Sequence, residues 1–388
     1  MYKDLLFTGQ PDRYEAISAA ELSASPLAAY VLAEMPHDLD AVREKTMTYA
    51  DLRAKHEGVL EQFTTSINDN TDLETASVTQ LDLAFMLGGY LPLNEDAYHE
   101  TPPRLLALLD QQADRFGLPH RMDYALIIDV NSAEFRRTGR MRTFTTGETA
   151  LGERDFYLGH SESEPFVKDA AYQLRSLVEA LDAVDVNRTL EAAAASMVTF
   201  RRYMGEYMKL SKDAFATMRP YLASYPDGIR NASGAFMPSV QLAELALHMP
   251  TDGQNTYIDE CMPYFPAWSR QTIRAFQEQS MRGDNVVTRV TSGDLVLDKG
   301  GKEALNSLVE AFLTFRTTHL AATRKQIPEA FGQAPPMSRR QIHEFGEPDI
   351  MGEGDDRSKK GTAGFDIVNI LGGAANRLVV TLKALEEN

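Results

Sequence analysis

Residues 301–327 read GKEALNSLVEAFLTFRTTHLAATRKQI. Apolar side chains recur in this stretch at steps of three and four residues, which is the period of a helix with one apolar face. They are Leu305, Leu308, Phe312 and Phe315. His319 continues that face near its C-terminal end. A neutral imidazole in a protein interior needs partners for its nitrogens, so His319 is either a hydrogen-bonded core residue or a ligand.

Arg316 precedes His319 by three residues, so the two side chains emerge close together on adjacent turns. Imidazole and guanidinium together suit haem, because its iron takes an axial imidazole and its carboxylate edge takes a planar, bidentate cation. Residues 361–366 read GTAGFD, a glycine-rich turn that opens a final helix. Such a turn allows the backbone to approach a ligand closely.

The run FRTTHL at 315–320, followed by a long polar loop, GTAGFD and a last helix, resembles the C-terminal signature of a known superfamily. This is the indoleamine 2,3-dioxygenase and tryptophan 2,3-dioxygenase superfamily, and the resemblance is closest to its monodechloroaminopyrrolnitrin synthase branch. It implies that His319 is the proximal iron ligand in haem b and that Arg316 contacts a haem propionate. It also implies that Gly361 and Gly364 lie against the cofactor and that Thr362 contacts the substrate.

A second informative stretch is AFATMRPYL at 214–222, which a turn joins to ASGAFMP at 232–238. An arginine among apolar residues needs an anionic acceptor if it is buried, so Arg219 is either a structural ion-pair residue or a ligand for a carboxylate. The resemblance implies the second role: Arg219 would hold the carboxylate of an amino-acid substrate and Phe215 would flank its indole. Ser233 would lie in a small-residue loop beside the haem and the substrate's amine.

Two further polar residues have alternative interpretations. Glu244 stands among apolar residues in QLAELAL, and proximal histidines commonly donate their second nitrogen to a carboxylate. The resemblance implies this role for Glu244, and a solvated glutamate is the alternative. His56 is either a histidine above the haem, as in tryptophan dioxygenases, or a core or surface residue. His343 lacks the second histidine that a zinc hydrolase motif requires.

Helical start and stop signals occur throughout the chain, and alternation of period two is rare, so we expect an all-α fold. The predicted organisation is a smaller, mostly helical domain over residues 1–150 that covers the distal side of the haem, and a helical haem-binding domain over 151–388. The polar stretch 136–163 is interpreted as the connection between them, with a helix starting at Ser163. Residues 333–360 are interpreted as a mobile loop over the active site, with plain disorder as the alternative.

One segment of the first predicted domain remains ambiguous. Residues 124–128 read YALII, a short apolar run that is typical of a buried strand but also occurs in buried helices.

Composition excludes several classes of partner. The 388 residues include 39 basic and 56 acidic side chains, and the formal net charge of -17 disfavours a nucleic-acid or anionic-membrane partner. The single Cys261 provides no disulfide framework, which favours a reducing compartment. With no signal-peptide layout and no long apolar run, we expect a cytoplasmic protein. The sequence specifies no oligomeric state.

Together these features predict a b-type haem enzyme that oxidises L-tryptophan or a related indole amino acid with dioxygen. The cofactor would carry the chemistry, so no side chain is assigned as a catalytic residue. One alternative is the oxidative ring rearrangement of tryptophan or 7-chlorotryptophan to a phenylpyrrole in secondary metabolism. Two others are a haem-binding sensor without activity and a plain helical interaction protein.

Overall fold

The computed structural model describes residues 26–68, 72–91, 98–180, 184–207, 210–226, 229–265, 267–326 and 367–386. All the regular structure in these ranges is helical and none of it is a strand, which confirms the all-α class. None of the helices in these ranges has the length and apolar character needed to cross a membrane.

The chain divides into two compact units, and each unit is discontinuous in sequence. The predicted division was a single cut after residue 150, whereas segments further along the chain return to the first unit. The first unit comprises Met1–Ser161, Leu210–Gly234 and Pro266–Trp268, and the second comprises Glu162–Lys209, Ala235–Phe265 and Ser269–Asn388.

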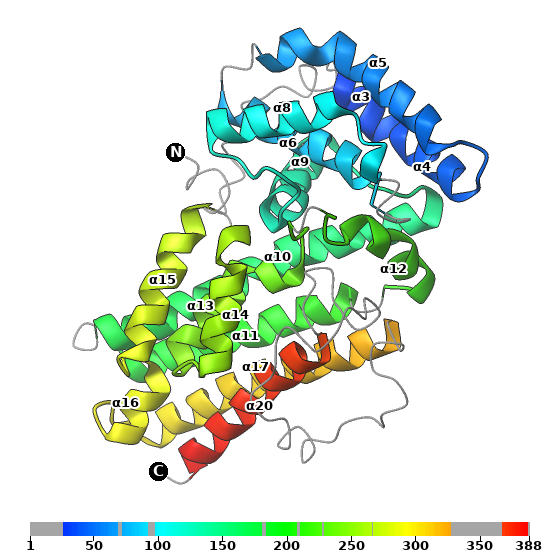
Figure 1. Ribbon diagram of the computed structural model, residues 1–388. Helices are drawn as coiled ribbons and strands as arrows, with labels where there is room; N and C mark the ends of the chain where they lie inside the picture. The colour runs from blue at the N-terminus through cyan, green and yellow to red at the C-terminus, as the bar shows by residue number, and fades with distance from the viewer. Residues whose placement is uncertain are drawn as a thin grey trace. The chain divides into compact units, whose positions relative to one another are not determined.

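Helix α6 lies at the centre of the first unit, and nearly all of its residues are buried. It packs against α3 and α8, and α3 also packs against α4 and α5 (Figure 1). Gly117 ends α8 in the left-handed conformation, with φ of 67°, as expected for a glycine that closes a helix. The helices are α3 (Pro26–Ala33), α4 (Met35–Arg43), α5 (Tyr49–Asn68), α6 (Leu73–Gly88) and α8 (Pro103–Phe116).

The ambiguous apolar run at 124–128 is helical. It lies in the π-helix η2 (Ala125–Val130), which α9 (Asn131–Thr138) continues. Five of the six residues of η2 are buried. The run is therefore apolar because this helix is covered on nearly every side, and not because it belongs to a sheet.

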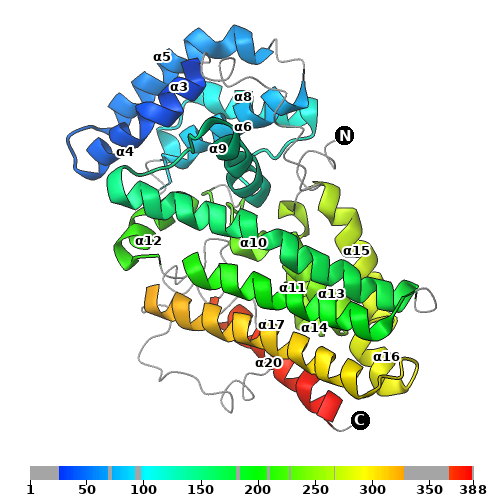
Figure 2. The ribbon, with the colours of Figure 1, turned by 180° about the vertical axis from the view of Figure 1, so that it is seen from behind.

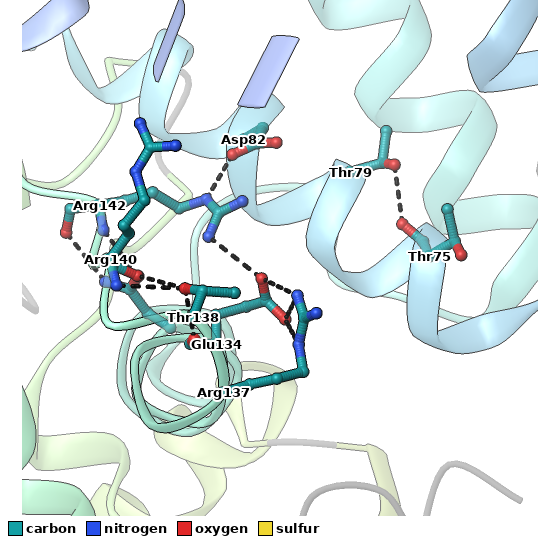
Figure 3. A network of polar contacts seen from close by, with 9 residues as sticks. Thr75, Thr79, Asp82, Glu134, Arg137, Thr138, Arg140 and Arg142 are labelled. Atoms are coloured by element: carbon teal, nitrogen blue, oxygen red, sulfur yellow. Dashed lines mark hydrogen bonds and ion pairs between the residues drawn. The ribbon is translucent and has the colours of Figure 1, made fainter. Parts of the chain in front are cut away.

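A buried network of charges joins α6, α9 and the segment that follows α9 (Figure 3). Arg142, which is 1% exposed, donates to Asp82 of α6, and its Nη1 lies 3.9 Å from Oε2 of Glu134 in α9. Arg137 contacts both oxygens of Glu134 at 2.8 Å. Two guanidinium groups therefore face two carboxylates, and each buried charge has a counter-charge.

Helix α10 (Gly147–Glu179) occupies most of the stretch that was interpreted as a connection, so that prediction is wrong. The predicted helix start at Ser163 is also wrong, because Ser163 is buried inside α10 and its Oγ donates to Sδ of Met204 at 3.4 Å. The physical reason is the composition of the helix's buried face. Its buried positions recur at helical spacing but carry polar groups, so no apolar period marks them. These residues are Glu153, Tyr157, His160 and Glu164.

In the second unit, α17 packs against both α11 and α20 (Figures 1 and 2). Helix α17 is the helix predicted over 301–327, and its predicted apolar face is buried. The helices of this unit are α11 (Val186–Tyr207), α13 (Pro238–Leu247), α14 (Asp252–Cys261), α15 (Ala267–Met281), α16 (Val286–Ser292), α17 (Lys299–Gln326) and α20 (Ile367–Glu386).

Candidate functional site

His319 lies near the C-terminal end of α17, in the second unit, and is half-buried. Its ring is nearly parallel to that of Phe315, one turn earlier, with centroids 5.8 Å apart and an interplanar angle of 29°. Phe200 of α11 packs edge-on against Phe315 at 4.8 Å. The half-buried imidazole therefore stands at the border of an aromatic wall, with its Nδ1 shielded from solvent.

Arg316 and Glu244, to which the resemblance assigned two different partners, contact each other. Nε of Arg316 donates to Oε1 of Glu244 at 3.0 Å, and Nη2 donates to the same oxygen. Both residues are buried. This side-on pair fixes α17 against α13 at the turn that precedes His319.

Two more donors complete the surroundings of Glu244. Its Oε2 accepts from Nε2 of Gln254 in α14 at 3.0 Å and from Nη2 of Arg377 in α20 at 3.2 Å. Burial alone would raise the pKa of Glu244, but Arg316 and Arg377 outweigh that effect and lower it to about 2. These four hydrogen bonds use the roughly four acceptor positions of a carboxylate. In this structure Glu244 therefore joins four helices, which differs from the expected contact with His319.

Arg219 and Phe215 lie in the first unit, on successive turns. Phe215 belongs to α12 (Lys212–Met218), and Arg219 begins the 3₁₀-helix η4 (Arg219–Leu222). Ser211 caps α12, since its Oγ accepts from the N–H of Ala214 at 3.1 Å. Both Phe215 and Arg219 are half-buried, so an aromatic face and a guanidinium stand together at the edge of the core.

Asn231 ties the Arg219 turn to the loop that carries Ser233. Its side-chain amide donates to the carbonyl oxygen of Tyr221 in η4 at 3.1 Å and accepts from the N–H of Ala232 at 2.7 Å. Ser233 is half-buried and comes directly after Ala232. The structure thus brings the Arg219 turn and the Ser233 loop together within one unit.

His160 is a residue of this region that sequence reasoning missed. A Cβ atom placed on Gly234, next to Ser233, would lie 3.8 Å from Nε2 of His160. Nδ1 of His160 lies 2.8 Å from the carbonyl oxygen of Phe156, one turn earlier in α10. A carbonyl only accepts, so Nδ1 carries the proton and Nε2 carries a lone pair. Burial lowers the pKa of His160 to about 4, which keeps the ring neutral.

The signal that would have identified His160 is its spacing from Phe156. An aromatic residue and a histidine four residues apart lie on one face of a helix. The signal was hidden because this stretch was interpreted as an irregular connection.

Several predicted residues are not among those that the structure describes. Gly361, Thr362, Gly364, His343 and the predicted loop at 333–360 lie outside the described residues.

His56 is buried in the first unit, where its Nδ1 lies 3.0 Å from the hydroxyl of Tyr90 and its ring is edge-on to that of Tyr30. Burial lowers the pKa of His56 to about 3. These contacts are those of a core histidine.

A surface pocket of about 210 Å³ in the second unit includes none of the predicted site residues. Its lining is mostly aliphatic and includes Leu295, Leu297 and Leu305. The polar side chains of its lining are those of Lys302 and Asn306.

Haem binding uses an axial imidazole and a cation beside the propionates, and His319 and Arg316 are residues of these two types. In the ranges that the structure describes, no three side chains of the His, Cys, Asp and Glu types come together as metal ligands. A porphyrin supplies the other ligands itself and needs one axial donor, a role that the imidazole of His319 would fill. Arg316 uses two of its roughly five N–H donors on Glu244, so it retains donors for a second anion.

No protein-family model matches the chain, and no curated protein matches it significantly.

Proposed function

We propose that the protein is a b-type haem enzyme that oxidises L-tryptophan or a related indole amino acid with dioxygen. The observation that carries the proposal is the half-buried His319, one turn after a buried Arg316–Glu244 pair that holds its helix in place. Bound haem would supply the activation of dioxygen. The protein would supply the axial nitrogen of His319 and a binding site for the amino acid.

Arg219 and Phe215 would bind the substrate in this proposal. The guanidinium of Arg219 matches the geometry of a carboxylate, and its half-buried position strengthens the hydrogen bonds relative to water. Phe215, one turn earlier, presents a ring on which an indole can pack. Holding the amino acid at both ends restricts its orientation, which is a large part of what an enzyme of this kind contributes.

His160 would interact with the indole N–H. Its Nε2 lies on the side of Gly234, and the low pKa of the buried ring keeps the imidazole uncharged at neutral pH. The imidazole would therefore act as a hydrogen-bond acceptor for the indole N–H.

Haem titration of the purified protein tests the proposal. We expect one haem to bind per chain. Its Soret band should shift when a ligand that displaces the axial imidazole is added, as expected for a single axial histidine. His319→Ala should lose most of this affinity. The control is His120→Ala, which removes a half-exposed surface histidine of the first unit that contacts Asp110. Equal haem affinity in the parent and in His319→Ala would overturn the assignment.

The reaction itself is tested on the haem-loaded protein. Mass spectrometry of the products from L-tryptophan and 7-chlorotryptophan distinguishes insertion of dioxygen from ring rearrangement, because the first adds two oxygen atoms to the substrate. A haem-loaded protein that consumes neither compound would contradict the enzymatic part of the proposal and leave the haem site standing.

A further inference from the structure

The side chain of Asn231 is fully buried and spans two backbone segments of the first unit. Its Nδ2 donates to the carbonyl oxygen of Tyr221 at 3.1 Å, and its Oδ1 accepts from the N–H of Ala232 at 2.7 Å. A buried amide that hydrogen-bonds at both ends is costly to replace, because each backbone group would otherwise be left without a partner.

Tyr221 is itself held from two other directions. Its ring stacks on that of Phe144 with centroids 4.7 Å apart and an interplanar angle of 3°. Its hydroxyl accepts from Nη1 of Arg43 at 2.6 Å. Because Tyr221 follows Arg219 by two residues in the same 3₁₀-helix, these contacts fix the turn from which the Arg219 side chain projects.

The other end of the Asn231 amide acts on the segment to which Asn231 itself belongs. Ala232 immediately precedes Ser233, so the hydrogen bond to its N–H sets the course of the chain that presents the Ser233 hydroxyl. Asn231 therefore links the Arg219 turn to the segment that continues into Ser233.

We infer that Asn231 is a positioning residue that sets Arg219 relative to Ser233, so that the site takes the carboxylate and the amine of an L-α-amino acid together. The inference rests on the proposed function. One carbon atom separates the two polar groups of an α-amino acid, so two protein groups recognise both only if their separation is fixed. The substrate's indole side chain, packed on the ring of Phe215, is the third point of contact. Three points of contact distinguish the two enantiomers.

The test compares Asn231→Leu with a matched variant of the same unit. Leucine matches asparagine in its branching and in its number of side-chain heavy atoms, and it removes both hydrogen bonds. The control is Asn131→Leu, because Asn131 is also fully buried and its amide likewise bridges backbone groups. Its Nδ2 donates to the carbonyl oxygen of Arg142 and its Oδ1 accepts from the N–H of the same residue, both at 3.0 Å.

Equilibrium binding of L-tryptophan and D-tryptophan is measured by titration calorimetry on the full-length protein, without and with haem. We expect the parent to prefer the L enantiomer. In Asn231→Leu the affinity for L-tryptophan should fall about tenfold or more, which corresponds to about 1.4 kcal/mol per decade. The affinity for D-tryptophan should change less, so the ratio of the affinities for the L and D enantiomers should approach one. Asn131→Leu should lose stability and keep the parent's preference, because a general loss of stability does not alter enantiomer selection.

An Asn231→Leu variant with the parent's preference would overturn the inference and leave the proposed function intact. A parent that binds neither enantiomer would remove the proposed function, and the inference with it. If Asn231→Leu fails to fold, Asn231→Ser replaces it. If neither folds while Asn131→Leu does, Asn231 is a folding residue and the inference is overturned.

Discussion

Glu153 in α10 is a fully buried carboxylate that three neutral donors surround. It accepts from the backbone N–H of Phe144 at 2.9 Å and from the hydroxyl groups of Thr145 and Tyr157 at 2.8 and 2.7 Å. Desolvation outweighs these hydrogen bonds and raises the pKa of Glu153 from 4.5 to about 7. The residue therefore titrates near neutral pH while it supports Phe144, the ring that stacks on Tyr221.

Stability should fall with rising pH because of this one group. Between its unfolded pKa of 4.5 and its folded pKa of about 7 the folded chain holds a proton that the unfolded chain has lost. The contribution of Glu153 is greatest below about pH 4.5 and declines until about pH 7, by on the order of 3 kcal/mol. Urea unfolding at several pH values should show a smaller decline for Glu153→Gln than for the parent. Glu148→Gln, at an exposed position of the same helix, is the control and should follow the parent.

Arg219→Leu separates an amino-acid enzyme from a haem sensor. A charge-assisted hydrogen bond to a carboxylate is worth about 1.5 to 3 kcal/mol, so L-tryptophan binding should weaken about tenfold to a hundredfold. Indole has no carboxylate and its binding should hardly change. Arg188→Leu, at an exposed position in α11, serves as the control. Unchanged tryptophan binding in Arg219→Leu would make Arg219 a structural ion-pair residue.

At the scale of elements, α6 approaches the Phe144 segment at a glycine. A Cβ atom on Gly88 would lie 2.8 Å from Cε1 and Cζ of Phe144. The Phe144 ring has no room to withdraw, because it is stacked between Phe85 at 4.5 Å and Tyr221 at 4.7 Å. This three-ring stack joins α6 to the turn that carries Arg219.

Gly88→Ala should therefore destabilise the protein although alanine favours helices. We expect overpacking to cost about 1–3 kcal/mol, more than the gain of about 1 kcal/mol in helix propensity. Gly58→Ala in α5 is the matched control, because a Cβ atom at Gly58 meets nothing within 4 Å. It should stabilise the protein by up to about 1 kcal/mol. Denaturant unfolding measures the stability of both variants. A higher stability in both would show that the three-ring stack can shift to accommodate the added methyl group.

The contacts of Glu244 predict a large and specific loss of stability. Glu244→Ala leaves Arg316 and Arg377 in the interior without their carboxylate, and breaking a buried pair in this way costs about 3–5 kcal/mol. Glu303→Ala on α17 removes an exposed carboxylate 3.7 Å from Lys299 and should change stability by less than about 0.5 kcal/mol. Chemical unfolding followed by circular dichroism measures both. A loss of stability in Glu244→Ala as small as that in Glu303→Ala would mean that the cluster around Glu244 contributes little to the free energy of unfolding.

The helices whose buried faces are apolar could be predicted from the sequence. The period of Leu305, Leu308, Phe312 and Phe315 predicted α17. Helix α10 could not be predicted over its first half, because its buried face consists of titratable side chains.

The partners of the site residues were beyond sequence reasoning for a different reason. Glu244 meets Arg316 and Arg377 across 72 and 133 positions of sequence, and no local period records such a contact. Sequence reasoning selected Glu244 and Arg316 individually but not their contact with each other. Arg377 and Asn231 were not selected at all.

For the whole molecule, the net charge of -17 predicts that thermal stability depends on ionic strength. Self-repulsion destabilises a compact chain of high net charge, and salt screens it as the Debye length falls from about 30 Å at 0.01 M to about 8 Å at 0.15 M. The melting temperature should rise between these concentrations of NaCl. Repeating the scan with sodium sulfate at equal ionic strength separates screening from the stabilising effect of sulfate. A melting temperature that stays flat in NaCl would contradict the prediction.

The cluster around Glu244 also has a consequence for electrostatic potential. Two guanidinium groups and one carboxylate leave one excess positive charge in the interior of a chain that is otherwise strongly acidic. Burial lowers the pKa of Arg377, which shows how poorly water compensates this charge. A positive potential one turn from His319 favours whichever state of a ligand carries the more negative charge. A metal held by His319 should therefore have a higher midpoint potential than in the Arg377→Met variant, a difference that redox titration measures.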